Sequence, residues 1–252
     1  MSSFSSIELK HNHLIDNIMS YMTEYDDFME SVSRVLDIGC DVDGKTMTWW
    51  ANQVTRDTRQ PLNIKCVGVN THDKLMARHE NVSYQRVDDI EKFNSSKKTF
   101  DILLCHDQLQ NLINPYEALS NWWHVAEQDA MLIVAVPQTT NVRFNILEYN
   151  VHLEQKYHYT MPQLIYMLAV SGWDCRSGFF KKDINDPWMY ALVYRSNIEP
   201  MDPKTTNLYK LAGDTDLLPK SAEDSISKYG YLRQRDLMLP WLDKNNMWME
   251  QQ

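Results

Sequence analysis

The fold is decided by one stretch of the chain, Val35-Leu36-Asp37-Ile38-Gly39-Cys40-Asp41-Val42-Asp43-Gly44. A short apolar run there ends in an acid and then in glycines, and residues 45–54 follow with the composition of a helix. This order predicts a first β-strand, a tight turn and a crossover helix, an arrangement that lies beneath nucleotide-like ligands. Glycine suits such a turn because it has no Cβ to obstruct a sharp bend or a close ligand.

Further apolar runs predict the rest of an α/β domain. Asn114-Pro115 is a cap followed by a favourable first helical residue, and Thr160-Met161-Pro162-Gln163 is a capping box, so a helix should begin at each. Strands and helices that alternate in this way indicate a doubly wound sheet, with ligands at the carboxyl ends of its strands. The further strands are expected at residues 64–70, 82–87, 100–105, 131–137, 174–180 and 188–194.

Composition divides the chain into three parts. Residues 1–32 have apolar side chains mostly three and four apart, which predicts a helical segment that covers the sheet edge or closes over a pocket. Residues 33–195 form the α/β domain. Residues 196–252 contain four prolines and few apolar residues before position 229, which predicts an extension that docks on the domain or on a partner.

Charge limits the classes of function. The chain has 252 residues, of which 43% are hydrophobic, enough for one large domain with an appendage. Its formal net charge is −9, from 34 acidic and 25 basic residues. Because nucleic acids are bound largely through Lys and Arg on their phosphates, this balance disfavours a nucleic-acid partner.

The cysteines and the apolar runs indicate the compartment. Cys40, Cys66, Cys105 and Cys175 are widely spaced in apolar surroundings, which is typical of reduced, buried thiols and not of a metal site. No apolar run reaches the roughly 20 residues of a membrane span, and the first residues lack the apolar core of a signal peptide. We therefore expect a soluble, cytoplasmic protein with no membrane contact and no metal.

Residues 35–44 resemble the first motif of class I S-adenosylmethionine (SAM)-dependent methyltransferases, V-L-D-I-G-C-G-x-G, with Asp41 in place of the second glycine. Residues 99–117 are similar to a second motif of that family, F-D-x-V-x-x-x-x-x-L-E-H-x-x-D-P, with Gln110-Asn111 replacing the Glu-His pair. The resemblance covers residues 33–195. It implies a mostly parallel, seven-stranded sheet with helices on both faces and an antiparallel edge hairpin.

The resemblance also implies a set of cofactor-binding residues. Asp37 would support the methionine end of SAM, Asn70 stands where the family has a ribose-binding acid, and Asp88 would bind the adenine amino group, with Asp89 as the alternative. We expect these side chains to converge with the end of the fourth strand. The other predicted cofactor-binding residues are Gly39, Cys40 and Gly44 of the turn and Cys105 of that strand.

The charge of the turn bears on the choice of ligand. Asp41 and Asp43 would oppose a phosphate but are compatible with the sulfonium and amino groups of SAM. A nicotinamide-binding Rossmann unit is disfavoured because the chain has no G-x-G-x-x-G, and the spacing of Gly39 and Gly44 does not suit one.

Two residues that follow the fourth strand are the candidates for catalysis. Methyl transfer to an oxygen or nitrogen can require a base, and His106 has an ordinary pKa near neutrality. Asp107 could orient it or bind a substrate amine. His152 and His158 are weaker candidates in residues 138–159, a segment that could contact substrate, although a structural or exposed role is commoner for any one histidine.

Two functions remain open at this point. The first is a SAM-dependent methyltransferase that acts on a small-molecule acceptor. The second is a catalytically inactive methyltransferase-fold protein that serves as a binding or assembly component, with a protein partner or self-association through residues 196–252. Asp37, Gly39 and Asp88 favour the first, whereas Asp41 and Asn70, like the Gln-Asn replacement noted above, favour the second.

Overall fold

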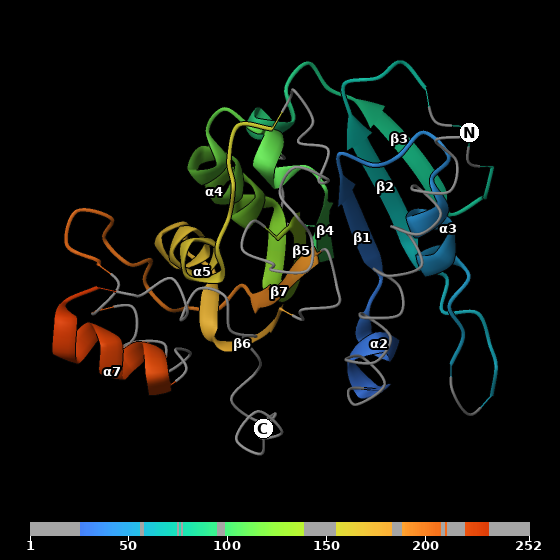
Figure 1. The fold of residues 1–252 in the computed structure, drawn as a ribbon. Coiled ribbons are helices and arrows are strands. Elements are labelled where there is room, and N and C mark those ends of the chain that lie inside the picture. Colours follow the sequence, from blue (N-terminus) through green and yellow to red (C-terminus); the bar gives the residue numbers. More distant parts are fainter. Residues whose placement is uncertain are drawn as a thin grey trace, which may run out of the picture.

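The computed structural model describes residues 26–55, 58–74, 76, 78–94, 99–138, 155–182, 188–207, 210 and 220–231. Within them one seven-stranded sheet has the strand order β3-β2-β1-β4-β5-β7-β6 (Figure 1). The first five strands are parallel, and β7 is antiparallel to both of its neighbours, so the predicted fold is confirmed. The strands are β1 (Arg34–Ile38), β2 (Lys65–Asn70), β3 (Val82–Arg86), β4 (Phe100–His106), β5 (Ala126–Pro137), β6 (Asp174–Lys182) and β7 (Trp188–Tyr194).

Helices lie on both faces of this sheet, as Figure 1 shows. In β1, Leu36 and Ile38 pack in the core that contains α4 and α5, whereas Val35 packs with Met47 and Trp50 of α3. Successive side chains of a strand point to opposite faces, so a short run of apolar residues fills both cores. The described helices are α2 (Asp26–Ser31), α3 (Lys45–Ala51), η1 (Ile90–Lys92), η2 (Leu109–Asn111), α4 (Pro115–Val125), α5 (Met161–Val170) and α7 (Lys220–Tyr229).

Both predicted helix starts are confirmed. The Asn114 side-chain oxygen accepts a hydrogen bond from the Glu117 backbone N–H at 3.2 Å. The Thr160 backbone N–H donates to Gln163 Oε1 at 3.0 Å. These side chains satisfy backbone donors that have no partner within a helix. This is why their residue types predicted the two helix starts from the sequence.

The fifth strand differs from the prediction because it begins at Ala126 and not at position 131. Arg195, just after β7, bonds this early part of the strand: its Nη1 donates to the Ala126 carbonyl at 2.6 Å, and its backbone N–H donates to the Ala130 carbonyl at 2.8 Å. Asp129 also donates its backbone N–H to the Arg195 carbonyl at 2.9 Å. The pairing partner is far along the chain, so residues 126–130 carry no local strand signal.

Asp101 joins the start of β4 to the start of β1. Its Oδ2 accepts hydrogen bonds from the Ser33 backbone N–H at 2.8 Å, the Ser33 hydroxyl at 2.9 Å and the Arg34 backbone N–H at 2.8 Å. Bonds to an ionised acceptor are stronger than neutral ones. The Phe-Asp element of the second motif therefore has a structural role in setting the register of two neighbouring strands.

We expect Asp101→Ala to lower the free energy of unfolding by about 2 kcal/mol, because three donors lose a charged acceptor at once. Urea unfolding measures this change. Asp73→Ala is the matched control, since Asp73 makes an exposed ion pair with Arg86 that contributes little. Equal losses in the two variants would contradict the structural role of Asp101.

Part of the C-terminal region packs on the domain. The Met201 backbone N–H donates to the Ala169 carbonyl at 3.2 Å, and the Tyr166 hydroxyl donates to the Pro203 carbonyl at 3.3 Å. In α7, Ile226 is buried in the core that contains α4 and α5. The sequence also has leucines at positions 237, 239 and 242 that could anchor the extension, and these lie outside the described residues. No helix in the described part of the chain is long and apolar enough to cross a membrane.

Candidate cofactor-binding site

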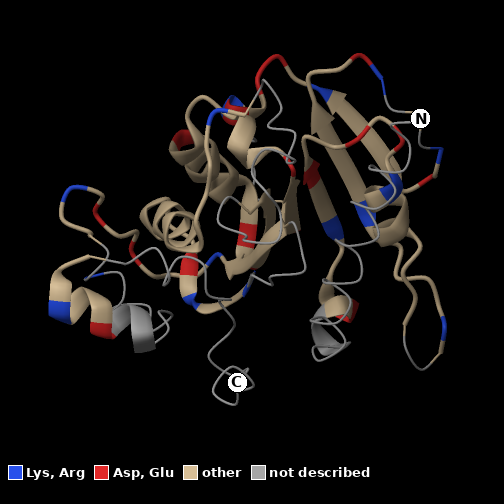
Figure 2. Cartoon of the chain, in the orientation of Figure 1, with Lys and Arg blue, Asp and Glu red and all other residues tan. Residues whose placement is uncertain are grey.

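The carboxyl ends of β1, β2 and β4 bring most of the predicted residues to one edge of the sheet. Ile38 lies beside Val69 of β2 on one side and beside Cys105 of β4 on the other. The next residue, Gly39, donates its backbone N–H to the Val69 carbonyl at 2.8 Å. The turn after β1 therefore lies between the ends of β2 and β4, and Figure 2 shows several acidic segments in the loops at this end of the sheet.

Asp37 is the buried acid of this edge. Only 6% of the residue is exposed, and no hydrogen bond to its carboxyl group is present among the described residues. Burial raises the pKa of Asp37 to about 8, and the negative charges of Asp41 and Asp43 add to the increase. The carboxyl group is thus mostly protonated at neutral pH, and a bound cation would stabilise its ionised form.

Gly39 has a left-handed backbone conformation, with φ of +74°. A Cβ at this position would lie 2.1 Å from Cγ of Gln108, so the Gln108 side chain packs directly on the turn. Both features require glycine. Gln108 carries no sequence signal of its own, although it is adjacent to the candidate Asp107.

Gly44 ends the turn and caps α3. Its φ is +61°, and its backbone N–H donates to the Asp41 carbonyl at 3.1 Å. The Lys45 backbone N–H donates to Asp43 Oδ1 at 3.3 Å. Asp43 therefore shapes the turn through its side chain, and Asp41 through its backbone carbonyl.

Asn70 has a structural role in addition to the ribose contact that the resemblance implies. Its Nδ2 donates to the Cys40 carbonyl at 3.0 Å, and its Oδ1 accepts from the Thr71 backbone N–H at 2.7 Å. A carboxylate could not donate the first of these bonds. The amide thus ties the turn after β1 to the end of β2.

His72 and Tyr84 extend this connection, and neither was identified from the sequence. His72 Nε2 lies 3.0 Å from the Cys40 carbonyl oxygen, and its Nδ1 lies 3.0 Å from the Tyr84 hydroxyl. The two rings stack with centroids 5.0 Å apart. Neither residue is part of a sequence motif, because His72 contacts a backbone carbonyl 32 residues away and the Tyr84 hydroxyl donates to the Asn70 carbonyl 14 residues away.

Cys40 and Cys105 have buried side chains at this edge. Burial raises the pKa of both thiols, which therefore stay protonated and pack as small apolar groups. Cys40 Sγ lies against Gly68, where a Cβ would come within 2.6 Å of it. Cys40 stabilises the turn through its backbone carbonyl group, which Asn70 and His72 contact.

The acidic turn after β3 lies beside the end of β2, because the Val87 backbone N–H donates to the Asn70 carbonyl at 3.0 Å. Asp89 is engaged within the turn: its Oδ1 accepts from the Glu91 backbone N–H at 2.9 Å, and its Oδ2 lies 3.3 Å from Lys92 Nζ. Asp88 is exposed, and the described residues make no hydrogen bond or ion pair with its side chain. Of the two candidate acids, Asp89 is therefore already bonded within the turn, whereas the Asp88 carboxylate is available to a ligand.

The candidate catalytic residues lie at the end of β4. His106 is half-buried, and its ring centroid is 4.9 Å from that of Trp188. Asp107 has a left-handed conformation with φ of +59°, and its Oδ1 accepts from Gln110 Nε2 at 2.7 Å. Asn111 Nδ2 donates to the Asp107 carbonyl at 3.1 Å, so the Gln-Asn replacement of the second motif fixes this loop.

The structure describes one of the two weaker histidine candidates. His158 is exposed and lies three residues before α5, in the connection from β5. His152 lies outside the described residues, as does most of the segment 138–159.

The strand order, the glycine turn after β1 and the acids at the carboxyl edge define the class I SAM-dependent methyltransferase fold. Residues 21–159 match the family described as methionine biosynthesis protein MetW, and the chain belongs to that family. No curated protein sequence matches the chain closely.

Solved structures share the fold at low sequence identity. Magnesium protoporphyrin IX methyltransferase (ChlM) from Synechocystis PCC 6803, with bound S-adenosylhomocysteine (SAH), has a TM-score of 0.56 and 14% identity, over 78% of this chain and 89% of that one. A SAM-dependent methyltransferase from Archaeoglobus fulgidus has a TM-score of 0.54 and 16% identity, over 77% and 100%. A putative methyltransferase in complex with the Haloferax volcanii Trm112 activator has a TM-score of 0.52 and 9% identity, over 75% of this chain and 98% of that one. These likenesses establish the fold.

Proposed function

We propose that the chain binds SAM at the carboxyl edge of the sheet and transfers its methyl group to a small-molecule acceptor. The observation that carries this proposal is Asp37, a buried carboxyl group that receives no hydrogen bond from the described residues. It lies next to the Gly39 turn, and Asp41 and Asp43 add negative charge. A ligand that brings positive charge would relieve the repulsion among the three acids.

The residues present fit SAM in three places. Gly39 makes the sharp turn that follows Asp37, the edge at Asp37 favours the amino and sulfonium groups, and Asp88 has a carboxylate free to accept from an adenine amino group. Asn70 departs from this pattern because its amide already holds the turn. Its Nδ2 retains one donor hydrogen, while its Oδ1 already accepts from the Thr71 backbone N–H and the Thr71 hydroxyl, so any contact with ribose hydroxyls would lack charge assistance.

Bound SAM supplies a methyl group on a positively charged sulfur, which is a reactive electrophile. The chain's own residues would hold the cofactor at Asp37 and Gly39 and align the acceptor with it. His106 would accept the proton of an oxygen or nitrogen acceptor at the end of β4. Asp107, which Gln110 holds in place, would bind an amino group of the substrate through its carboxylate.

A second candidate function is supported by the engagement of Asn70. An inactive methyltransferase-fold protein that serves as a binding component has no need of strong ribose contacts, and Asn70 Nδ2 is used to stabilise the turn. Residues 196–252 would then supply contacts to a protein partner or to a second copy. The two proposals differ in the affinity that they predict for SAM.

We also infer that the protein works in the cytoplasm. The four cysteines are free and buried, which suits a reducing compartment.

Calorimetric titration of the full chain tests the proposal. We expect SAM and SAH to bind with micromolar dissociation constants and ATP not to bind, because Asp41 and Asp43 oppose its phosphates. ATP is the matched control, since it shares adenine and ribose with SAM and differs in charge. Absence of SAM binding at millimolar ligand would contradict the enzyme proposal and favour the binding-component function.

A further inference from the structure

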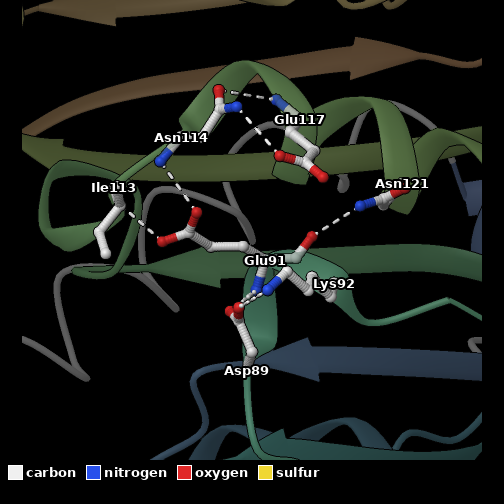
Figure 3. Close-up of polar contacts among 7 residues, drawn as sticks. All are labelled: Asp89, Glu91, Lys92, Ile113, Asn114, Glu117 and Asn121. Atoms are coloured by element: carbon white, nitrogen blue, oxygen red, sulfur yellow. Dashed lines mark hydrogen bonds and ion pairs between the residues drawn. The ribbon is translucent and has the colours of Figure 1, made fainter.

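Glu91 fastens the acidic turn after β3 to the start of α4. Its Oε1 accepts a hydrogen bond from the Ile113 backbone N–H at 2.6 Å, and its Oε2 accepts from the Asn114 backbone N–H at 2.8 Å (Figure 3). A single carboxylate thus takes two successive backbone donors just before the helix. Hydrogen bonds to an ionised acceptor are about twice as strong as neutral ones.

Two further hydrogen bonds hold the same turn against α4. Asn121 Nδ2 donates to the Glu91 carbonyl at 2.8 Å, as Figure 3 shows, and the buried Trp122 Nε1 donates to the Ile90 carbonyl at 3.1 Å. At its other end the turn is attached to β2 through Val87. Asp88 lies between these two attachments.

The segment that Glu91 contacts is itself held from another side. The Lys156 and Tyr157 backbone N–H groups donate to the Gln110 carbonyl at 2.9 and 3.0 Å, and the Tyr157 hydroxyl donates to the Ile113 carbonyl at 2.9 Å. Glu91 therefore connects the acidic turn to a point that is fixed within the domain. Because Glu91 holds the turn at this point, its carboxylate can set the position of Asp88, three residues earlier in the turn.

We propose that Glu91 is a positioning residue that holds Asp88 where it accepts a hydrogen bond from the adenine amino group of SAM. This inference rests on the proposed function. It gives each of the three acids of the turn a different role. Asp89 caps η1 and interacts with Lys92, Glu91 binds the start of α4, and Asp88 keeps its carboxylate for a ligand.

The test compares SAH with its hypoxanthine counterpart, S-inosylhomocysteine, in which a 6-oxo group replaces the 6-amino group. The wild-type protein should bind SAH about tenfold more tightly, because the 6-amino group donates to Asp88 whereas the 6-oxo group presents an acceptor to the same carboxylate. In Glu91→Ala and in Asp88→Ala this ratio should fall close to unity, and in Glu91→Gln it should be intermediate. Calorimetry measures the ratio, and circular dichroism establishes that each variant is folded.

Glu117→Ala is the matched control. Glu117 also lies at the start of α4 and accepts from Asn114 Nδ2 at 3.0 Å, but its side chain makes no described contact with residues 87–92. This variant should keep the wild-type ratio. If Glu117→Ala reduced the affinity ratio as much as Glu91→Ala does, the effect would belong to the helix start in general. The positioning role proposed for Glu91 would then be wrong.

The outcomes separate the inference from the proposed function. If Glu91→Ala weakens both ligands equally and keeps their ratio, Glu91 is only structural and the inference fails, while SAM binding stands. If the wild-type protein binds neither ligand, the proposed function fails and the inference fails with it. If Glu91→Ala does not fold, Glu91→Gln decides by the same ratio.

Discussion

Asp37→Asn is expected to abolish SAM binding and, at the same time, to stabilise the free protein in mildly alkaline solution. The folded protein holds the pKa of Asp37 at about 8, far above its ordinary value of 3.8. Between these two values the folded state binds more protons than the unfolded state, so the free energy of unfolding falls as pH rises. One such group contributes a decrease of about 1.4 kcal/mol per pH unit across that window.

The asparagine removes this penalty because it carries no charge and keeps the shape of the side chain. The difference in stability between Asp37→Asn and the wild-type protein should therefore increase with pH and level off above about pH 8. Urea unfolding at several pH values measures this difference in stability, and calorimetry measures the loss of SAM binding. A variant that is less stable than the wild type at every pH would show that the acid is satisfied within the protein.

Gly39→Ala is expected to have the second large effect, a loss of about 2–4 kcal/mol in the free energy of unfolding together with loss of SAM binding. A left-handed conformation costs about 1–2 kcal/mol for a residue with a Cβ. The remainder comes from overlap, because the new Cβ would lie 2.1 Å from Cγ of Gln108.

A double-mutant cycle with Gln108→Ala separates these two causes. Gln108→Ala removes the overlapping atom, so Gly39→Ala should cost less in that background and only the conformational strain should remain. Gly172→Ala is a useful comparison, since Gly172 has φ of +98° but no neighbour closer than 3.3 Å to a built Cβ. If the two mutations at positions 39 and 108 are additive, Gln108 does not pack on the turn as described.

The sequence predicted the fold because its signals are local. Val35 and Leu36 fill opposite cores within a run that is apolar throughout, which is the pattern of a parallel strand buried on both faces. Asn114 and Thr160 begin helices through contacts with residues three positions later. Gly39 and Gly44 both have left-handed conformations, which is the reason for their place in the turn.

The parts of the site that escaped prediction depend on partners distant in the sequence. Asn70 bonds a carbonyl 30 residues earlier, and Glu91 bonds backbone groups 22 and 23 residues later. Backbone partners leave no pattern in the side chains, so neither role has a sequence signature. The resemblance assigned Asn70 to the ribose by position alone, and only the geometry revealed that its amide is already in use.

The central claim is that the positive charge of SAM lies against Asp37, and proton release tests it most directly. Calorimetric titration with SAM at neutral pH, in buffers of different ionisation enthalpy, counts the protons lost on binding. Because Asp37 is mostly protonated in the free protein, its ionisation on binding a cation should release roughly one proton. No SAM binding, or binding without proton release by the wild-type protein, would contradict the claim.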